Sequence, residues 1–318
     1  MELEAIVAPD GRVAFGTLVS ATALTENEQK TDIAEEDMDE DRLVLRAQGE
    51  IARRRATMGD DYPFRIDDNG RALNFVSPVS KAGSVYLFCL FLSHATDRDI
   101  ISEAQSPTIT NTIRDLFQAC ATVAAGGYVG GPAISFGFPR PDGATFLKAL
   151  KRVYKLFGDG KPHKRPRAAA ARAIKDNGID IIAWKRSIDR LPCTFYLIAQ
   201  VASGGNWHDK SVIPDRLHFH QYWFEHPPGS QPQDAMFVPF GLAPEEPADG
   251  TSYEELLIDH MQSVAHKYGT LIYRDRLAGY AAIGFELFDD GEENIERVAD
   301  IKKIVKWVNK YTEKLRTA

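Results

Sequence analysis

The feature that most constrains this chain is a pair of apolar segments, each with one polar residue inside it. Residues 179–186 read IDIIAWKR and residues 194–203 read TFYLIAQVAS. Their length and composition predict two neighbouring strands. Asp180 and Gln200 are unusual there, because burying an unpaired carboxylate or amide costs free energy. The pair therefore predicts either a functional site or buried polar contacts that fix the strand register.

These residue types suit a divalent metal centre that hydrolyses phosphodiesters. Mg²⁺ binds oxygen ligands from carboxylates, amides and backbone carbonyls, and a nearby lysine offsets charge on the attacked phosphate. We expect Asp180 to be the principal metal ligand, Gln200 to be a neutral ligand, and the carbonyl of Val201 to complete the shell. Asp176 is a second candidate carboxylate, or else a turn residue in the sequence Asp-Asn-Gly.

The same stretch resembles the PD-(D/E)xK, or restriction-endonuclease-like, superfamily, in the branch with G-x-D on one strand and Q-x-K on the next. Residues 178–180 (GID) match the first element, and residues 200–202 (QVA) stand at the second, with alanine in place of lysine. The lysine migrates in that superfamily, so the resemblance points to Lys210 or Lys185 as the catalytic lysine. Lys185 lies at an odd spacing from Asp180, which turns it to the opposite face of a regular strand, so Lys210 is the first choice.

The resemblance implies an α/β fold with a leading helix and a restriction-endonuclease-like mixed central sheet flanked by helices. It implies a Mg²⁺- or Mn²⁺-dependent endonuclease that hydrolyses DNA, in preference to RNA, as an effector of prokaryotic defence against phage. It suggests a regulatory ATPase, helicase or sensor subunit as a partner, and it leaves open whether the chain forms a homo-oligomer. The alternative is a catalytically inactive nuclease-fold subunit that binds nucleic acid or a partner protein, which the missing Q-x-K lysine favours.

The leading helix of the superfamily often carries a glutamate that faces the metal. Residues 110–125 are the candidate helix here, and Gln118 stands where an acidic residue is expected. Asp115 and Glu103 are the other acidic candidates. Asp115 is better explained as an exposed helix residue than as a metal ligand.

The charge of the chain is unevenly distributed. The net charge is −7, yet residues 148–175 contain ten lysines and arginines and a single acidic residue, Asp159. A basic segment immediately before Asp180 can follow a phosphate backbone while the rest of the surface stays acidic. Without Asp180 next to it, the basic segment would indicate only a solvated helix face and a loop. The residues expected to bind nucleic acid are Lys161, Lys164, Arg165, Arg167 and Arg172.

We expect three parts: an N-terminal α+β elaboration (1–104), a nuclease-like core (105–245) and a C-terminal helical segment packed on the core (246–318). Residues 2–20 and 62–76 read as hairpins. Helices are expected over residues 84–94, 110–125, 144–157, 252–267 and 294–315. Strands are expected over residues 133–138, 217–226 and 270–282.

His218 and His220 would share one face of the strand over residues 217–226, where they could bind zinc or form an ordinary buried histidine pair. A metal-dependent small-molecule enzyme would be the corresponding function.

The N-terminal sequence and the cysteines point to a cytoplasmic protein without a membrane partner. MELEAIVAPDG lacks the continuous apolar region of a signal peptide, and the longest apolar run, residues 85–93, is too short to span a bilayer. Cys89, Cys120 and Cys193 have no C-x-x-C spacing, so we expect reduced cysteines that serve packing.

Overall fold

The computed structural model describes residues 1–18, 33–95, 105–140, 142–165, 178–242, 252–291 and 293–317. The chain is a mixed α/β protein that divides into two compact units. The smaller consists of Met1–Thr108 and Ile304–Ala318, and the larger of Ile109–Lys303. This division differs from the expected three parts, since residues 252–303 belong with the central sheet and residues 304–318 with the N-terminal region.

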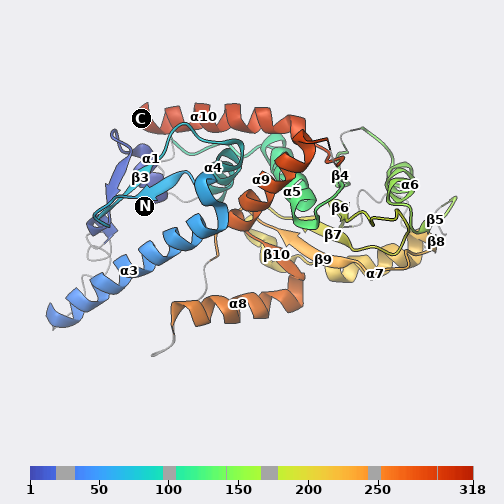
Figure 1. The fold of residues 1–318 in the computed structure, drawn as a ribbon, viewed down its shortest axis with the longest axis horizontal. Coiled ribbons are helices and arrows are strands. Elements are labelled where there is room, and N and C mark those ends of the chain that lie inside the picture. Colours follow the sequence, from blue (N-terminus) through green and yellow to red (C-terminus); the bar gives the residue numbers. More distant parts are fainter. Residues whose placement is uncertain are drawn as a thin grey trace. The chain divides into compact units, whose positions relative to one another are not determined.

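The larger unit is built on a five-stranded mixed sheet in the order β10-β9-β7-β6-β4 (Figure 1). Strand β6 runs antiparallel to both neighbours, whereas β7, β9 and β10 are parallel to one another. The strands are β4 (Ala133–Ser135), β6 (Ile181–Trp184), β7 (Tyr196–Val201), β9 (Gln233–Phe237) and β10 (Thr270–Ile272). A separate pair is formed by β5 (Lys161–Pro162) and β8 (Phe224–His226).

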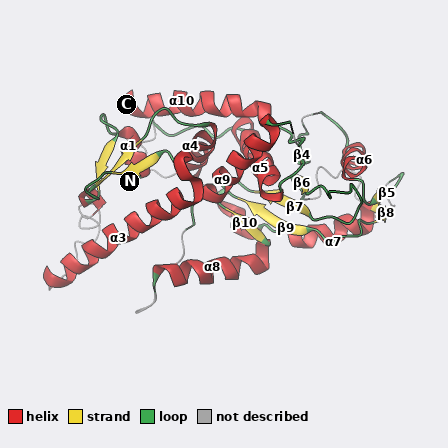
Figure 2. Ribbon diagram, in the orientation of Figure 1, coloured by secondary structure: helices red, strands yellow, loops and turns green. Residues whose placement is uncertain are grey.

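Helices cover both faces of this sheet (Figure 2). Helix α5 packs against β4, β6 and β7, whereas α7 and α8 pack on the other face against β7, β9 and β10 (Figure 1). Helix α6 joins α7 in an aromatic core that includes Phe136, Phe146 and Phe219. The elements are α5 (Asn111–Val129), α6 (Phe146–Phe157), η2 (Gly205–Asp209), α7 (Val212–Trp223), α8 (Tyr253–Tyr268), α9 (Arg274–Asp289) and η3 (Val298–Asp300).

Helix α5 is fixed at both ends and along its length. The Thr110 hydroxyl accepts the N–H of Ile113 at 3.3 Å, and Gly130 closes the helix in the left-handed conformation. A Cβ on Gly127 would lie 1.9 Å from the carbonyl oxygen of Tyr280 in α9. Only glycine allows the two helices to approach this closely, so the last turns of α5 are held against α9.

The smaller unit contains a three-stranded antiparallel sheet in the order β1-β3-β2. The expected hairpin over residues 62–76 is confirmed, with Gly70 at a φ of +69° in its turn. Helix α4 is buried along residues 82–92. The elements are α1 (Glu2–Val7), β1 (Arg12–Ala14), α3 (Ile33–Met58), η1 (Gly59–Asp61), β2 (Phe64–Ile66), β3 (Ala72–Phe75), α4 (Lys81–Ser93) and most of α10 (Ile301–Thr317).

The predicted hairpin over residues 2–20 is wrong in its first half. Residues Glu2–Val7 form a helix, because Leu3 and Ile6 bury one face at helical spacing. Only Arg12–Ala14 is a strand, and it pairs with β3.

The predicted strand over residues 217–226 is also wrong for the residues that precede Phe224. Residues Val212–Trp223 form helix α7, which the Ser211 hydroxyl caps by accepting the N–H of Ile213 at 3.2 Å. Val212, Phe219 and Trp223 bury one helical stripe in the aromatic core. This packing overrides the preference of aromatic residues for strands.

Two C-terminal predictions need correction. The strand predicted over residues 270–282 ends at Ile272, and α9 follows it from Arg274. The helix predicted from residue 294 begins only at Ile301, because Arg297 adopts a left-handed φ of 70°. The helix predicted over residues 252–267 is confirmed, with a capping box between Ser252 and Glu255.

No helix within the described ranges is both long enough and apolar enough to cross a bilayer. Of the three reduced cysteines, Cys89 and Cys120 are buried and Cys193 is exposed.

Candidate active site

A cleft of about 750 Å³, here called the sheet-end cleft, opens where β6 begins and β7 ends. Its walls come from the first turns of α5, the segment after β4 and the segment after β7. The residues that line it are Asn111, Thr112, Arg114, Asp115, Gln118, Phe138, Pro139, Asp180, Val201, Ser203, Gly204, Asn206 and Lys210.

Asp180 is held rigidly at the floor of this cleft. Its Oδ2 accepts the N–H of Val201 at 2.8 Å, which ties the carboxylate to the end of β7. Its own N–H donates to the carbonyl of Ala199 at 2.9 Å, and its carbonyl accepts the N–H groups of Phe136 at 2.7 Å and Gly137 at 2.9 Å. The strand ends therefore position the carboxylate.

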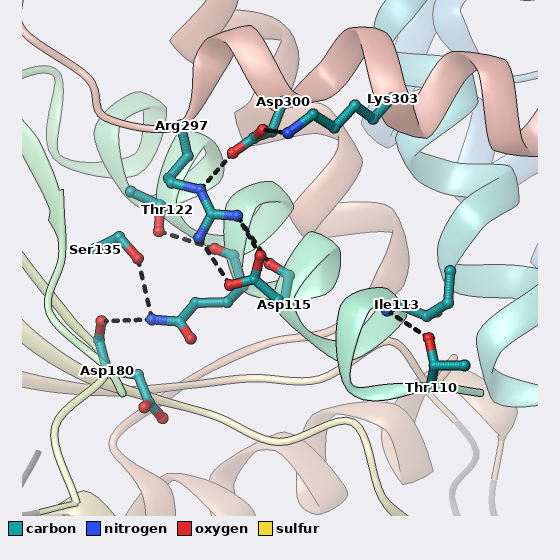
Figure 3. Close-up of polar contacts among 10 residues, drawn as sticks. Thr110, Ile113, Asp115, Thr122, Ser135, Asp180, Arg297, Asp300 and Lys303 are labelled. Atoms are coloured by element: carbon teal, nitrogen blue, oxygen red, sulfur yellow. Dashed lines mark hydrogen bonds and ion pairs between the residues drawn. The ribbon is translucent and has the colours of Figure 1, made fainter. Parts of the chain in front are cut away.

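Gln118 reaches Asp180 from helix α5. Its Nε2 donates to the Asp180 carbonyl at 3.3 Å and to Ser135 Oγ at 3.0 Å. Dashed lines that end at the labelled Ser135 and Asp180 mark both hydrogen bonds in Figure 3. A Cβ on Gly137 would lie 2.4 Å from Gln118 Nε2 and 2.5 Å from Asp180 Oδ1. A glycine at residue 137 thus leaves room for both side chains, and an amide occupies the position where sequence reasoning expected an acid.

Asp115, the other acidic candidate on α5, is engaged by Arg297. The guanidinium donates from Nη1 to Oδ1 at 3.0 Å and from Nη2 to Oδ2 at 2.7 Å, and it also pairs with Asp300 (Figure 3). Burial lowers the pKa of Arg297, but the two carboxylates outweigh it and raise that pKa above its usual value. A cation bound to Asp115 would have to compete with this guanidinium. Glu103 lies outside the described residues.

The structure separates the two lysine candidates. Lys210 lines the sheet-end cleft, and its N–H donates to the carbonyl of Trp207 at 3.0 Å. Lys185 follows the far end of β6, roughly 16 Å along the strand direction from Asp180, and is not one of the described residues lining the cleft. The geometry therefore favours Lys210.

Gln200 does not join Asp180 among the described cleft residues. Alternation along β7 places it on the face of Tyr196 and Ile198, which belong to the aromatic core, whereas Val201 lies on the other face. Its Oε1 is buried without a hydrogen-bond partner among the residues that the structure describes. The metal candidate Asp176 falls outside those residues.

The basic residues proposed for nucleic acid are only partly described. Lys161, Lys164 and Arg165 are exposed, and Lys161 pairs with Glu225 at 2.9 Å. Arg167 and Arg172 lie outside the described residues.

The predicted shared face of His218 and His220 does not exist, because both residues lie on helix α7, two positions apart. His218 is exposed, whereas His220 Nε2 meets the hydroxyl of Tyr196 at 3.2 Å. Burial, followed by the charge of Arg216, lowers the pKa of His220 to about 4. This imidazole is therefore neutral at pH 7.

The donor set of the sheet-end cleft fits a hard cation. The Asp180 carboxylate, the Gln118 amide and the carbonyl of Val201 each offer an oxygen atom that could bind such a cation. In a regular strand the Val201 carbonyl shares the edge of β7 with the N–H that Asp180 accepts. Mg²⁺ commonly takes one or two carboxylates and keeps several waters. Among the described residues, no group of three or more His, Cys, Asp and Glu side chains could hold a metal.

Sequence reasoning named Asp115 and Gln118 but missed the rest of the polar stripe by which α5 faces the cleft. Asn111, Asp115 and Gln118 recur at helical spacing on an otherwise apolar helix, with Arg114 beside them. That periodicity was the available signal. Comparison of the chain with protein-family models, curated proteins and solved structures finds no match.

Proposed function

We propose that this chain is a Mg²⁺- or Mn²⁺-dependent endonuclease of the restriction-endonuclease-like kind that hydrolyses DNA in the sheet-end cleft. The observation that carries the proposal is the meeting of Asp180 and Lys210 in one cleft at the ends of β6 and β7. A carboxylate for a metal and an ammonium group for a phosphate are the two charges that this chemistry requires.

The order of elements supports the same proposal. Helix α5 precedes the central strands, and the sheet is mixed and covered by helices on both faces. The carboxylate stands immediately before β6, and the antiparallel partner β7 ends beside it. This arrangement agrees with the leading helix and central mixed sheet that the resemblance implies.

Each cleft residue then has a role. Asp180, the Val201 carbonyl and Gln118 would hold the cation, which when bound polarises the phosphate and lowers the pKa of a bound water. Lys210 and Arg114 place positive charge where the scissile phosphate gains negative charge. Ser211 anchors the segment that carries Lys210, because its Oγ donates to the carbonyl of Lys267 at 2.6 Å.

A plasmid assay tests the proposal. Purified full-length protein should nick supercoiled DNA with Mg²⁺ or Mn²⁺ and not with EDTA, and Asp180→Ala should abolish nicking. Asp189→Ala is the matched control, since Asp189 is an exposed turn residue that accepts the N–H of Leu191. Nicking that survives in Asp180→Ala would refute the assignment.

A second comparison separates the lysines. Lys210→Met should lower the nicking rate, whereas Lys185→Met should leave it close to that of the wild type. The opposite result would assign the phosphate-facing charge to Lys185, at the other end of β6.

The second candidate function is a catalytically inactive nuclease-fold subunit that binds nucleic acid or a protein. Three features favour it: Ala202, at the expected lysine position, is fully buried; Gln118 replaces an acid; and Asp115 is paired with Arg297. Binding of DNA without cleavage, in wild type and Asp180→Ala alike, would select this alternative. A role in prokaryotic defence under an ATPase, helicase or sensor partner rests on the resemblance alone.

A further inference from the structure

A second concave site lies next to the sheet-end cleft and has a different character. This aromatic pocket encloses about 300 Å³. Aromatic rings, apolar side chains and two histidines line it: Gly205, Trp207, His208, Val238, Phe240, Gly241, Leu242, His260, Leu271 and Tyr273. The mixture of ring faces with two imidazoles suits a planar ligand that carries polar atoms on its edge.

The rings of the pocket present flat surfaces. The planes of Trp207 and Phe240 are inclined by only 20°, with centroids 6.3 Å apart. His208 lies against Trp207, with centroids 3.8 Å apart and planes inclined by 33°. Aromatic side chains are the surfaces on which proteins stack nucleobases.

One short segment builds both sites. Gly204, Asn206 and Lys210 line the sheet-end cleft, whereas the alternating neighbours Gly205 and Trp207 line the aromatic pocket. The residues of this segment that line the pocket therefore stand only two to five positions before Lys210, which lines the cleft.

This segment is held rigidly. The Tyr268 hydroxyl donates to the carbonyl of His208 at 2.8 Å, and the N–H of Trp207 donates to the carbonyl of Gly204 at 3.1 Å. Trp207 also packs against the Tyr268 ring, with centroids 5.2 Å apart. The pocket is thus preformed, which reduces the entropy cost of binding.

We propose that the aromatic pocket receives one base of a single-stranded nucleic acid whose neighbouring phosphate lies in the sheet-end cleft. The base stacks on Trp207 and Phe240, and the imidazoles of His208 and His260 hydrogen-bond to its edge. The placement of the phosphate rests on the proposed function, whereas the stacking of the base does not. An aliphatic ligand would use the apolar walls and leave both imidazoles without a role.

The test compares two strands that differ only in their bases. Full-length protein is titrated, in EDTA, with a fluorescein-labelled single-stranded oligodeoxynucleotide and with an abasic strand of equal length, and anisotropy gives both dissociation constants. Wild type should bind the base-bearing strand more tightly. Trp207→Ala should weaken that binding roughly 5- to 150-fold and leave the abasic strand unaffected, which corresponds to about 1–3 kcal/mol of stacking.

A second variant protects the test against misfolding, because Trp207 is almost fully buried. A Cβ on Gly205 would meet no atom within 4 Å, so Gly205→Leu adds bulk in the pocket without a clash. It should reduce the preference for bases as Trp207→Ala does. Phe195→Ala is the matched control, since it removes an exposed aromatic ring beyond the opposite end of β7.

Each outcome decides the inference. Equal affinity for the two strands, no binding of either strand, or a preference that persists in both pocket variants would overturn it. Loss of the preference in Gly205→Leu with an unchanged preference in Phe195→Ala would support it. The proposed function fails separately: a chain that never nicks DNA can still prefer bases, and a chain that nicks DNA can lack the preference.

Discussion

Two carboxylates, one in each unit, show how differently this chain uses an acidic side chain. In the smaller unit, Glu2 is 8% exposed, and its Oε1 accepts the hydroxyl of Tyr86 at 2.7 Å, the Nη1 of Arg54 at 2.9 Å and the hydroxyl of Tyr62. In the larger unit, Asp180 accepts a backbone N–H and lines a cleft of about 750 Å³. The first carboxylate is enclosed by side-chain donors, and the second faces open volume.

The difference separates a stabilising role from a chemical one. Removing Glu2 would take an acceptor from two hydroxyls and from Arg54, whose guanidinium would keep its contact with Glu50 at 3.3 Å, in a place that water reaches poorly. Burial, and then the charge of Glu2, already raises the pKa of Tyr62 well above its usual value. Removing the charge of Asp180 would change the chemistry of the cleft that it lines. If the proposed function holds, activity should therefore depend on Asp180, and stability on Glu2.

The largest effect is expected for Asp180→Asn. The amide keeps an oxygen that accepts the Val201 N–H, so the midpoint of urea denaturation should stay close to that of the wild type. If the cleft cleaves DNA, the nicking rate should fall about 10³-fold, since a metal ligand accounts for several kcal/mol of transition-state stabilisation. A destabilised Asp180→Asn protein would show that Asp180, like Glu2, mainly stabilises the fold.

Glu2→Ala should have the converse effect. Breaking a buried ion pair by removing one partner costs about 3–5 kcal/mol. Urea denaturation, followed by circular dichroism, should therefore show a clear loss of stability. Glu2→Gln retains an acceptor for the tyrosine hydroxyls and should lose less. An unchanged midpoint in Glu2→Ala would mean that this network contributes no net stability.

A variant of His220 tests whether a second buried group outside the cleft contributes to stability, as we expect of Glu2. Its pKa of about 4 lies below the usual 6.5, so the unfolded chain binds more protons between these pH values. The contribution to stability is therefore complete above pH 6.5 and is lost as the pH falls towards 4, by an amount on the order of 3 kcal/mol. Replacement by phenylalanine should flatten this part of the stability–pH curve, and an unflattened curve would assign the dependence to other groups.

Gly137→Ala should disturb the cleft and spare the fold. The added Cβ would press on Gln118 Nε2 and Asp180 Oδ1, which are side-chain atoms and not backbone, and we expect Gln118 to give way. A displacement of about 1 Å can lower a rate by up to roughly 10²-fold. The nicking rate should fall while the melting temperature changes little. Unchanged nicking would show that the position of Gln118 is not critical.

The sequence predicted the β6–β7 pair and the cleft position of Asp180 and Lys210 because local signals were strong there. Asp180 and Gln200 each interrupt an apolar run. The glycines at residues 204 and 205 mark the turn that returns the chain towards Asp180. The separation of Gln200 from Asp180 was not predictable. Asp180 stands just before β6, where its carbonyl accepts the N–H groups of Phe136 and Gly137, so strand alternation from Ile181 onwards does not fix the orientation of the Asp180 side chain.

The errors at α1, α7 and α9 share one cause. LEAIVA, LHFHQYW and RDRLAGYAA contain β-branched or aromatic residues that favour strands locally, yet each buries a helical stripe. Partners distant in sequence supply that burial: Glu2 meets Tyr62 and Tyr86, and a Cβ on Gly284 in α9 would lie 2.4 Å from the Val123 carbonyl of α5. Such contacts carry no signal within a short window of sequence.

The smallest effect is expected at the exposed basic residues of the larger unit. Lys164 and Arg165 belong to the basic segment that precedes β6, and both side chains are exposed, so Lys164→Ala with Arg165→Ala should change stability by no more than about 0.5 kcal/mol. If they bind phosphates, the slope of log affinity for DNA against log salt concentration should become shallower by about 1 for each phosphate that is no longer neutralised. The Lys161→Ala variant is informative beside them, because Lys161 is already paired with Glu225 at 2.9 Å and should change the slope less. An unchanged slope in the double variant would exclude Lys164 and Arg165 from the nucleic-acid surface and would favour Arg114 and Lys210, inside the cleft, as phosphate-facing charges.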